Sequence, residues 1–184
     1  MRTDGPGESV LLLLDVVDVL TEREIGYAVI GALAASIYGA IRVSADSDLV
    51  LSVGMSEARQ LESVLSAAGF QTELRQGDFS DPIPGLLEAK DGFGNRVDLL
   101  IGLRGLEPEA FQRTREVPFH GAALRFIGLE DFIAMKVFAG GPVDLKDARR
   151  AVETAGTSLD RALVRRLATR YGADALQAFE RLTG

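Results

Sequence analysis

Three aspartates at or within apolar, strand-like segments are the feature that most constrains this chain. Asp46 and Asp48 lie two residues apart, just before the apolar run at 49–53, and Asp98 interrupts a second apolar run at 97–101. In an extended backbone, residues i and i+2 point to the same face, so the first two carboxylates can converge. If the two runs are neighbouring strands, all three carboxylates meet at one end of a sheet.

Like charges beside a buried sheet are costly unless a cation neutralises them, and hard oxygen ligands suit Mg²⁺. An acid flanked by apolar residues, as Asp98 is, is seldom fully buried without a partner, and we expect it at an inward-looking position. The pattern therefore predicts a divalent-metal site. A solvated strand end is the alternative explanation for Asp46 and Asp48, because an isolated Asp-x-Asp pair is common at such ends.

A strand that leads directly into a helix precedes the acidic pair. The apolar run at 27–30 is followed by Gly31 and by a helix-forming segment at 32–38. The free backbone N–H groups at a helix N-terminus can hold phosphate. This segment predicts a phosphate-binding turn close to the aspartates.

Hydrophobic periodicity predicts an α+β fold, with a mixed β-sheet flanked by helices and a C-terminal helical cap. Helices are expected at 8–24, 32–38, 55–68, 130–139, 142–154, 159–171 and 174–182, and strands at 27–30, 49–53, 70–74, 86–90, 96–101 and 123–127, with a hairpin turn at 91–95. We expect a core at 1–128 that includes the N-terminal helix, and a C-terminal helical subdomain at 129–184.

Composition indicates a soluble globular protein. The 184 residues are 47% hydrophobic and 26% charged, enough for one domain with a buried core. No apolar run approaches the roughly 20 residues of a membrane span, and the N-terminus does not resemble a secretory signal. With no cysteine, the reducing cytoplasm is the simplest expected location, although absent cysteine permits any compartment.

Several enzyme classes lack their motifs in this sequence. Without cysteine the chain has no thiolate metal site, and its single histidine, His120, cannot build a zinc cage alone. We expect His120 to be an exposed or satisfied turn residue. No Walker phosphate loop, Gly-x-Ser-x-Gly elbow or Gly-x-Gly-x-x-Gly fingerprint is present, which disfavours P-loop ATPases, serine hydrolases and dinucleotide-binding enzymes.

The net charge of −7 argues against nonspecific nucleic-acid binding by the whole surface. The segment at 141–184, however, has eight basic and six acidic residues. A polyanionic partner would meet this segment, although solvated helix faces explain the same charges.

The aspartate pattern resembles the nucleotidyltransferase superfamily, in which a strand, a Gly-Gly or Gly-Ser pair, Asp-x-Asp and a third Asp follow one another. Gly39-x-x-Arg42-x-Ser44-x-Asp46-x-Asp48 is similar to the bacterial branch that contains abortive-infection toxins and small nucleotidyltransferases. The segment at 128–136, which ends in Lys136, and the Asp-x-x-Asp at 144–147 resemble the helical motifs of that branch. The likeness covers roughly residues 25–150.

The resemblance implies a mechanism. Asp46 and Asp48 would hold two Mg²⁺ ions, with Mn²⁺ as an alternative, that bridge a nucleoside triphosphate, while Asp98 binds one metal and helps to deprotonate an acceptor hydroxyl. The hydroxyl attacks the α-phosphorus and pyrophosphate leaves. The implied nucleotide-binding residues are Gly31, Ala32, Arg42, Ser44 and Lys136.

The sequence departs from the family pattern at three places. Ala32 replaces the usual second Gly or Ser, Ser47 replaces an apolar residue between the acids, and Gly140-Gly141 replaces an arginine that relatives often carry.

The residues around the acids have structural alternatives. Arg42 could pair with an aspartate instead of a phosphate, and Lys136 could be a snorkelling lysine. For Asp144 and Asp147 the structural reading leads, because acids are favoured in the first turns of a helix.

We therefore predict a Mg²⁺-dependent nucleotidyltransferase that transfers NMP from an NTP to a hydroxyl of RNA such as tRNA, a protein or a small molecule. A role in a toxin–antitoxin pair would fit the resemblance. A noncatalytic binding or antitoxin-like module on the same fold is the second hypothesis, which Ala32 and Ser47 keep open. An acidic surface cluster on an unrelated α/β domain is the third. The sequence predicts no membrane partner and leaves the oligomeric state open.

Overall fold

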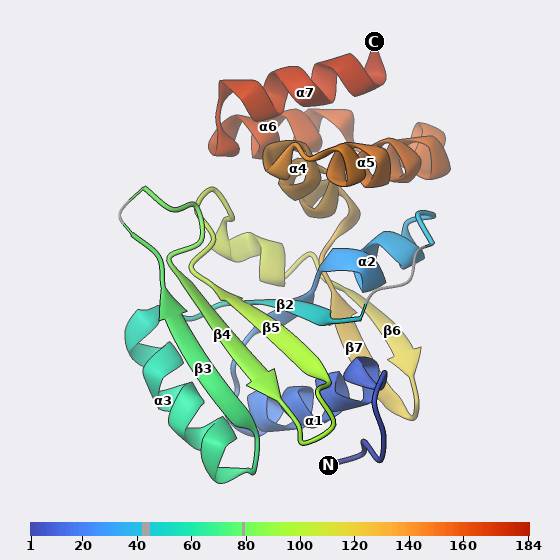
Figure 1. Cartoon of the computed structure of the whole chain (residues 1–184). Coiled ribbons are helices and arrows are strands. Elements are labelled where there is room, and N and C mark those ends of the chain that lie inside the picture. The colour runs from blue at the N-terminus through green and yellow to red at the C-terminus, as the bar shows by residue number, and fades with distance from the viewer. Residues whose placement is uncertain (42–44, 79) are drawn as a thin grey trace.

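A seven-stranded mixed sheet forms the centre of the computed structural model, which describes residues 1–41, 45–78 and 80–184 (Figure 1). The strand order is β3-β4-β5-β2-β1-β7-β6, and the pairs β2/β5 and β1/β7 are parallel whereas the others are antiparallel. The strands are β1 (Tyr27–Val29), β2 (Ser47–Leu51), β3 (Gln71–Gln76), β4 (Gly85–Lys90), β5 (Arg96–Ile101), β6 (Arg115–Phe119) and β7 (Ala122–Phe126).

Helices cover the sheet and continue beyond it. They are α1 (Ser9–Glu22), α2 (Gly31–Ile37), α3 (Met55–Ala67), α4 (Leu129–Ala139), α5 (Pro142–Ala155), α6 (Arg161–Tyr171) and α7 (Ala173–Thr183). Helix α1 packs on β2 and β5, and α3 packs on β3 and β4. Figure 1 shows α4–α7 gathered into a separate helical layer beyond the end of the sheet. The predicted α+β class with a C-terminal helical cap is confirmed.

Strand β5 shows how the sheet separates its two faces. Val97, Leu99 and Ile101 are fully buried, whereas the residues between them are only partly buried. Since side chains alternate along a strand, the buried set faces the core beneath α1 and α3. Asp98 therefore lies on the opposite face, which we call the open face of the sheet. The expectation that Asp98 looks inward is wrong, because the alternation of β5 gives the inner face to its apolar neighbours.

The helical layer is joined to the sheet by apolar and ionic contacts. The Tyr38 and Phe132 rings lie 5.2 Å apart, and the Tyr38 hydroxyl donates to the Ile127 carbonyl at 2.6 Å. Arg113, which precedes β6, donates to both carboxylate oxygens of the buried Asp131 in α4, each at 2.7 Å. The boundary between 128 and 129 as a division of the chain stays a prediction.

Two strands differ from the sequence expectation. Strand β2 begins at Ser47 rather than at residue 49, because Ser47 and Asp48 pair with Val97 and Asp98 of β5. Strand β6 was not predicted, since it contains Pro118 and charged residues. It lies at the sheet edge, where a missing backbone N–H is tolerated.

Strands β6 and β7 are joined by a tight turn at His120 and Gly121, both with positive φ. His120 is exposed in this turn, as expected. In the described part of the chain no helix is long and apolar enough to cross a membrane.

Candidate active site

The three predicted aspartates meet on the open face of the sheet. Strands β2 and β5 are parallel neighbours, and their register places Asp48 directly beside Asp98. Asp46 precedes β2 by one residue, and its carboxylate pairs with Arg96 at the start of β5. The condition stated from the sequence, that the two apolar runs lie side by side, is therefore met.

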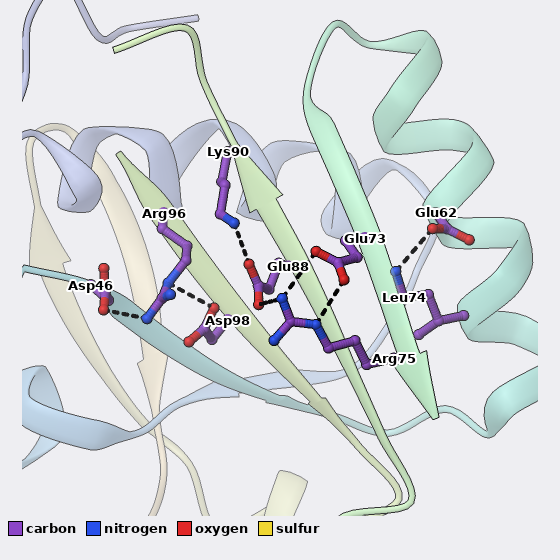
Figure 2. A network of polar contacts seen from close by, with 9 residues as sticks. All are labelled: Asp46, Glu62, Glu73, Leu74, Arg75, Glu88, Lys90, Arg96 and Asp98. Atoms are coloured by element: carbon purple, nitrogen blue, oxygen red, sulfur yellow. Dashed lines mark hydrogen bonds and ion pairs between the residues drawn. The ribbon is translucent and has the colours of Figure 1, made fainter. Parts of the chain in front are cut away.

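The row of carboxylates continues across the sheet. Glu88 of β4 lies beside Asp98, and Glu73 of β3 lies beside Glu88, so four acids on four neighbouring strands stand in register with Asp48 at one end. Glu88 is 3% exposed and forms ion pairs with Lys90 and, at 3.0 Å, with Arg75 (Figure 2). Sequence reasoning missed Glu88, although it is an acid within a mostly apolar strand, the same signal that identified Asp98.

Arg96 was also missed, and among the described residues it forms ion pairs with two of the three aspartates. Its guanidinium lies between two of the aspartates, with an ion pair to Asp46 and with Nε 3.2 Å from Oδ1 of Asp98 (Figure 2). The sequence shows an arginine two residues before Asp98. It does not show that strand pairing would turn the side chain toward Asp46.

Burial and charge raise the proton affinity of Asp98. Its pKa is raised to about 6, mainly because burial penalises the charged form, and the Asp48, Glu88 and Asp46 carboxylates raise the pKa further while Arg96 lowers it. A carboxyl group with this pKa can accept and release a proton near neutral pH.

Gly31 is the point where α2 meets the aspartates. Its φ is +63°, and a Cβ at this position would lie 1.9 Å from Oδ2 of Asp48. Only glycine therefore permits both the left-handed backbone and the close carboxylate. The Ile30 N–H donates to the Asp48 carbonyl at 2.9 Å and fixes β2 against the start of α2. Ala32 is not among the residues with positive φ, so alanine causes no backbone strain there.

No protein-family model matches the sequence, and neither does any curated protein. Solved structures do match. ANT(2'')-Ia in complex with adenylyl-2''-tobramycin has a TM-score of 0.62, covering 90% of this chain and 99% of that chain at 17% identity. This chain has the nucleotidyltransferase fold. An antigenic nucleotidyltransferase-like protein from Paracoccidioides brasiliensis has a TM-score of 0.53, with 95% and 92% of the two chains covered at 14% identity.

The lincosamide antibiotic adenylyltransferase LnuA, in its lincomycin-bound structure, is a third match. Its TM-score is 0.50, with 83% of this chain and 99% of that chain covered at 12% identity. At these identities the likeness establishes the nucleotidyltransferase fold and no residue's role.

Lys136 lies in α4 of the helical layer and forms ion pairs with two acids of α5. Its ammonium lies 2.7 Å from Oδ1 of Asp144 and 3.1 Å from Oδ2 of Asp147, and its side chain is 11% exposed. This arrangement provides the charge balance expected of a structural cluster. Its predicted role in nucleotide binding stays a prediction. Arg42 and Ser44, also predicted to bind nucleotide, lie outside the described residues.

The carboxylates suit a divalent cation in chemistry, although Arg96 lies among them. Within the ranges 1–41, 45–78 and 80–184, no three His, Cys, Asp or Glu side chains form a group that could hold a metal ion as placed. Yet Oδ1 of Asp98 is buried and accepts no hydrogen bond, and its ion pair with Arg96 at 3.2 Å leaves its lone pairs available to a metal ion. Hard carboxylate oxygens on one face are the donors that Mg²⁺ and Mn²⁺ prefer.

Proposed function

We propose that this chain is a nucleotidyltransferase enzyme that transfers NMP from a nucleoside triphosphate to a hydroxyl group of a small molecule. The observation that carries the proposal is the pairing of Asp48 with Asp98 on adjacent parallel strands, with Asp46 on the same face and Gly31 packed against Asp48. Three carboxylates at one point of a sheet are costly for folding alone, and they suit a cation-dependent reaction on phosphate.

Asp46, Asp48 and Asp98 would hold the divalent cation, Mg²⁺ or Mn²⁺, with two ions expected. When bound, such ions neutralise developing charge on the triphosphate and on the leaving pyrophosphate. The bend at Gly31 brings the start of α2 against the Asp48 carboxylate. The backbone of Gly31 and Ala32 would therefore contact the phosphates of a triphosphate held at the aspartates.

Asp98 would act as the proton acceptor. The acceptor hydroxyl oxygen attacks the α-phosphorus, its proton passes to the Asp98 carboxylate, and the bond to pyrophosphate breaks. In the metal-free chain burial raises the pKa of Asp98 to about 6, which makes it more basic than an ordinary aspartate; the proton-acceptor role itself rests on its position beside Asp48.

Charge favours a small, neutral or cationic acceptor over a polyanion. The chain has a net charge of −7, and Glu73, Glu88, Asp98 and Asp48 follow one another across the open face, with ion pairs to Arg75, Lys90 and Arg96 that balance part of this charge. Of the structures with this fold, ANT(2'')-Ia is in complex with adenylyl-2''-tobramycin and the adenylyltransferase LnuA is lincomycin-bound. An RNA or protein acceptor, and with it a toxin–antitoxin role, is the alternative that the experiment below distinguishes.

The test is incubation with each of the four α-labelled NTPs and Mg²⁺ or Mn²⁺, with three kinds of acceptor in separate reactions. These are a panel of aminoglycosides and lincosamides, total RNA, and a protein extract. We expect label on a small molecule, and no label with Asp48→Asn or in EDTA. Label on RNA or protein would show that the acceptor is that macromolecule and not a small molecule. No metal-dependent label in any reaction would favour the noncatalytic module and overturn the proposed activity.

A further inference from the structure

Arg96 and Lys90 form a natural comparison on the open face of the sheet. Both are cations, and they lie directly opposite each other on the neighbouring strands β5 and β4. Lys90 pairs with Glu88, whereas Arg96 turns toward Asp46 and Asp98 (Figure 2). Two neighbouring cations therefore serve different sets of carboxylates, and only one of them lies among the proposed metal ligands.

The contact between Arg96 and Asp98 is electrostatic and incompletely bonded. Arg96 Nε and Asp98 Oδ1 lie 3.2 Å apart, yet both atoms are buried and neither makes a hydrogen bond. Arg113, by contrast, donates two hydrogen bonds of 2.7 Å to Asp131. A bidentate pair of that kind is strong and geometrically specific. Arg96 donates a short hydrogen bond to Asp46 but none to Asp98, so its hold on Asp98 is the weaker one, which a divalent cation can replace.

We infer that Arg96 is the built-in counter-cation of the metal-free site and that it yields its place when a divalent cation binds. The inference rests on the proposed function, because it takes Asp46 and Asp98 as metal ligands. Oδ2 of Asp46 and Oδ1 of Asp98 face the guanidinium and would also face the incoming ion. Because like charges repel at such distances, Arg96 and a divalent ion cannot both occupy this position. Arg96 is a positioning residue: it holds the empty carboxylates together and sets the metal affinity.

The test compares Arg96→Gln with Lys90→Gln. Each variant removes one positive charge from the same face, and Lys90 contacts none of the three aspartates in the described contacts. Binding of Mn²⁺ alone is measured by electron paramagnetic resonance, and thermal unfolding is measured in EDTA and in Mn²⁺. We expect Arg96→Gln to tighten Mn²⁺ binding by about three- to fivefold, the upper part of the fold-change that a partly exposed ion pair supports. Lys90→Gln should change it by less than about twofold, because its partner Glu88 is not a ligand.

Unfolding temperatures give a second, independent readout. Arg96→Gln should lower the unfolding temperature in EDTA, because the carboxylates then lack their counter-cation, and saturating Mn²⁺ should restore it. Arg96→Lys, which keeps the charge without the planar fork, should lie between the wild-type chain and Arg96→Gln in Mn²⁺ affinity. A merely structural arginine would lower stability in both conditions without tightening Mn²⁺ binding.

Three results would overturn the inference: equal Mn²⁺ affinities of wild-type and Arg96→Gln chains, equal tightening by Arg96→Gln and Lys90→Gln, or no Mn²⁺ binding by either the wild-type chain or Arg96→Gln. The labelled-NTP assay separates this failure from that of the proposed function. A chain that transfers NMP but shows no selective effect of Arg96→Gln loses only the inference. A chain without transfer in which Arg96→Gln still tightens Mn²⁺ binding selectively keeps the inference and loses the activity.

Discussion

Two charge clusters of this chain both combine arginine with aspartate and glutamate, yet they shift the pKa of a buried or half-buried carboxyl group in opposite directions. Where the sheet meets the helical layer, Arg113 binds Asp131 through two hydrogen bonds and lies 2.9 Å from the buried Glu107. Arg166 of α6 donates to both oxygens of Glu107. The pKa of Glu107 is lowered to about 2, mainly by the hydrogen bond from Arg166, which outweighs the effect of burial.

On the open face, burial and neighbouring carboxylates outweigh the cation. Burial dominates at Asp98, and the carboxylates of Asp46, Asp48 and Glu88 add to it while the Arg96 guanidinium opposes it, so the pKa of Asp98 is raised to about 6. The first cluster is complete as a structural tie between two parts of the fold. The second favours an additional cation, and this contrast separates a structural ion cluster from a candidate catalytic one.

The largest expected effect is on catalysis. Asp48→Asn should lower NMP transfer by about 100-fold or more, because loss of a metal ligand removes several kcal/mol of transition-state stabilisation. The fold should persist, which circular dichroism checks, since the substitution reduces negative charge on the open face. The matched variant Glu107→Gln, in the structural cluster, should retain transfer. Equal losses in the two variants would erase the distinction between the clusters.

The second prediction concerns stability. Arg113→Met should lower the free energy of unfolding by about 3–5 kcal/mol, because it leaves the buried Asp131 without its bidentate partner. Arg165→Met, which breaks an exposed pair with Glu180, should cost less than about 1 kcal/mol. Urea unfolding of both variants provides the comparison. A similar small cost in both would show that the inner cluster is not a structural tie.

The third prediction concerns Gly31. Gly31→Ala should lower stability by about 1–3 kcal/mol through backbone strain at positive φ. The added Cβ would also displace the Asp48 carboxylate that lies 1.9 Å from its position, so NTP-dependent transfer should fall as well. Gly121→Ala is the control for strain alone, since its φ is +80° and its added Cβ meets no atom within 4 Å. Loss of transfer in both variants would remove the special role of Gly31.

The fourth prediction is that pH moves the stability of the two clusters in opposite directions. The pKa of Glu107 is lowered from 4.5 to about 2, so its contribution is present above pH 4.5 and is lost as pH falls toward 2. The pKa of Asp98 is raised from 3.8 to about 6, so the native state binds more protons between these values. Its contribution therefore favours folding below about pH 4 and is lost as pH rises through 6.

Denaturation midpoints of the metal-free chain from pH 2 to 7 test this prediction. Glu107→Gln should flatten the slope below pH 4.5, and Asp98→Asn should flatten the opposing slope between pH 4 and 6. If Asp98→Asn instead flattened the acid limb, the direction assigned to its pKa would be wrong.

The sequence predicts most of this fold because its elements are marked by local signals. The apolar residues of α1, the turn at 91–95 and the alternation of β5 are sufficient to place those elements. Strand β6 was missed because Pro118 is compatible with a strand only at an edge, and sequence does not show where the edge lies.

The candidate site was predicted only in part, because sequence does not show which strands are neighbours. Asp46, Asp48 and Asp98 stand out as acids in apolar surroundings, but their meeting depends on the parallel pairing of β2 with β5, which joins segments about 50 residues apart. Arg96 and Glu88 enter the site only through that pairing and its continuation into β4. Glu88 carries the local signal of an acid within a mostly apolar strand, but its place beside Asp98, like that of Arg96 beside Asp46, is set by strand pairing, which no local pattern shows.

The most direct test is a crystal structure of the chain with Mn²⁺ and a non-hydrolysable NTP analogue, with the metal located by anomalous scattering. We expect an ion bound by Asp48 and Asp98 together, at the distances of about 2.0–2.2 Å that small divalent ions make with oxygen, and with the Arg96 guanidinium moved away from Asp98. An ion that avoids Asp98, or no ion at all with Arg96 still between Asp46 and Asp98, would contradict the account.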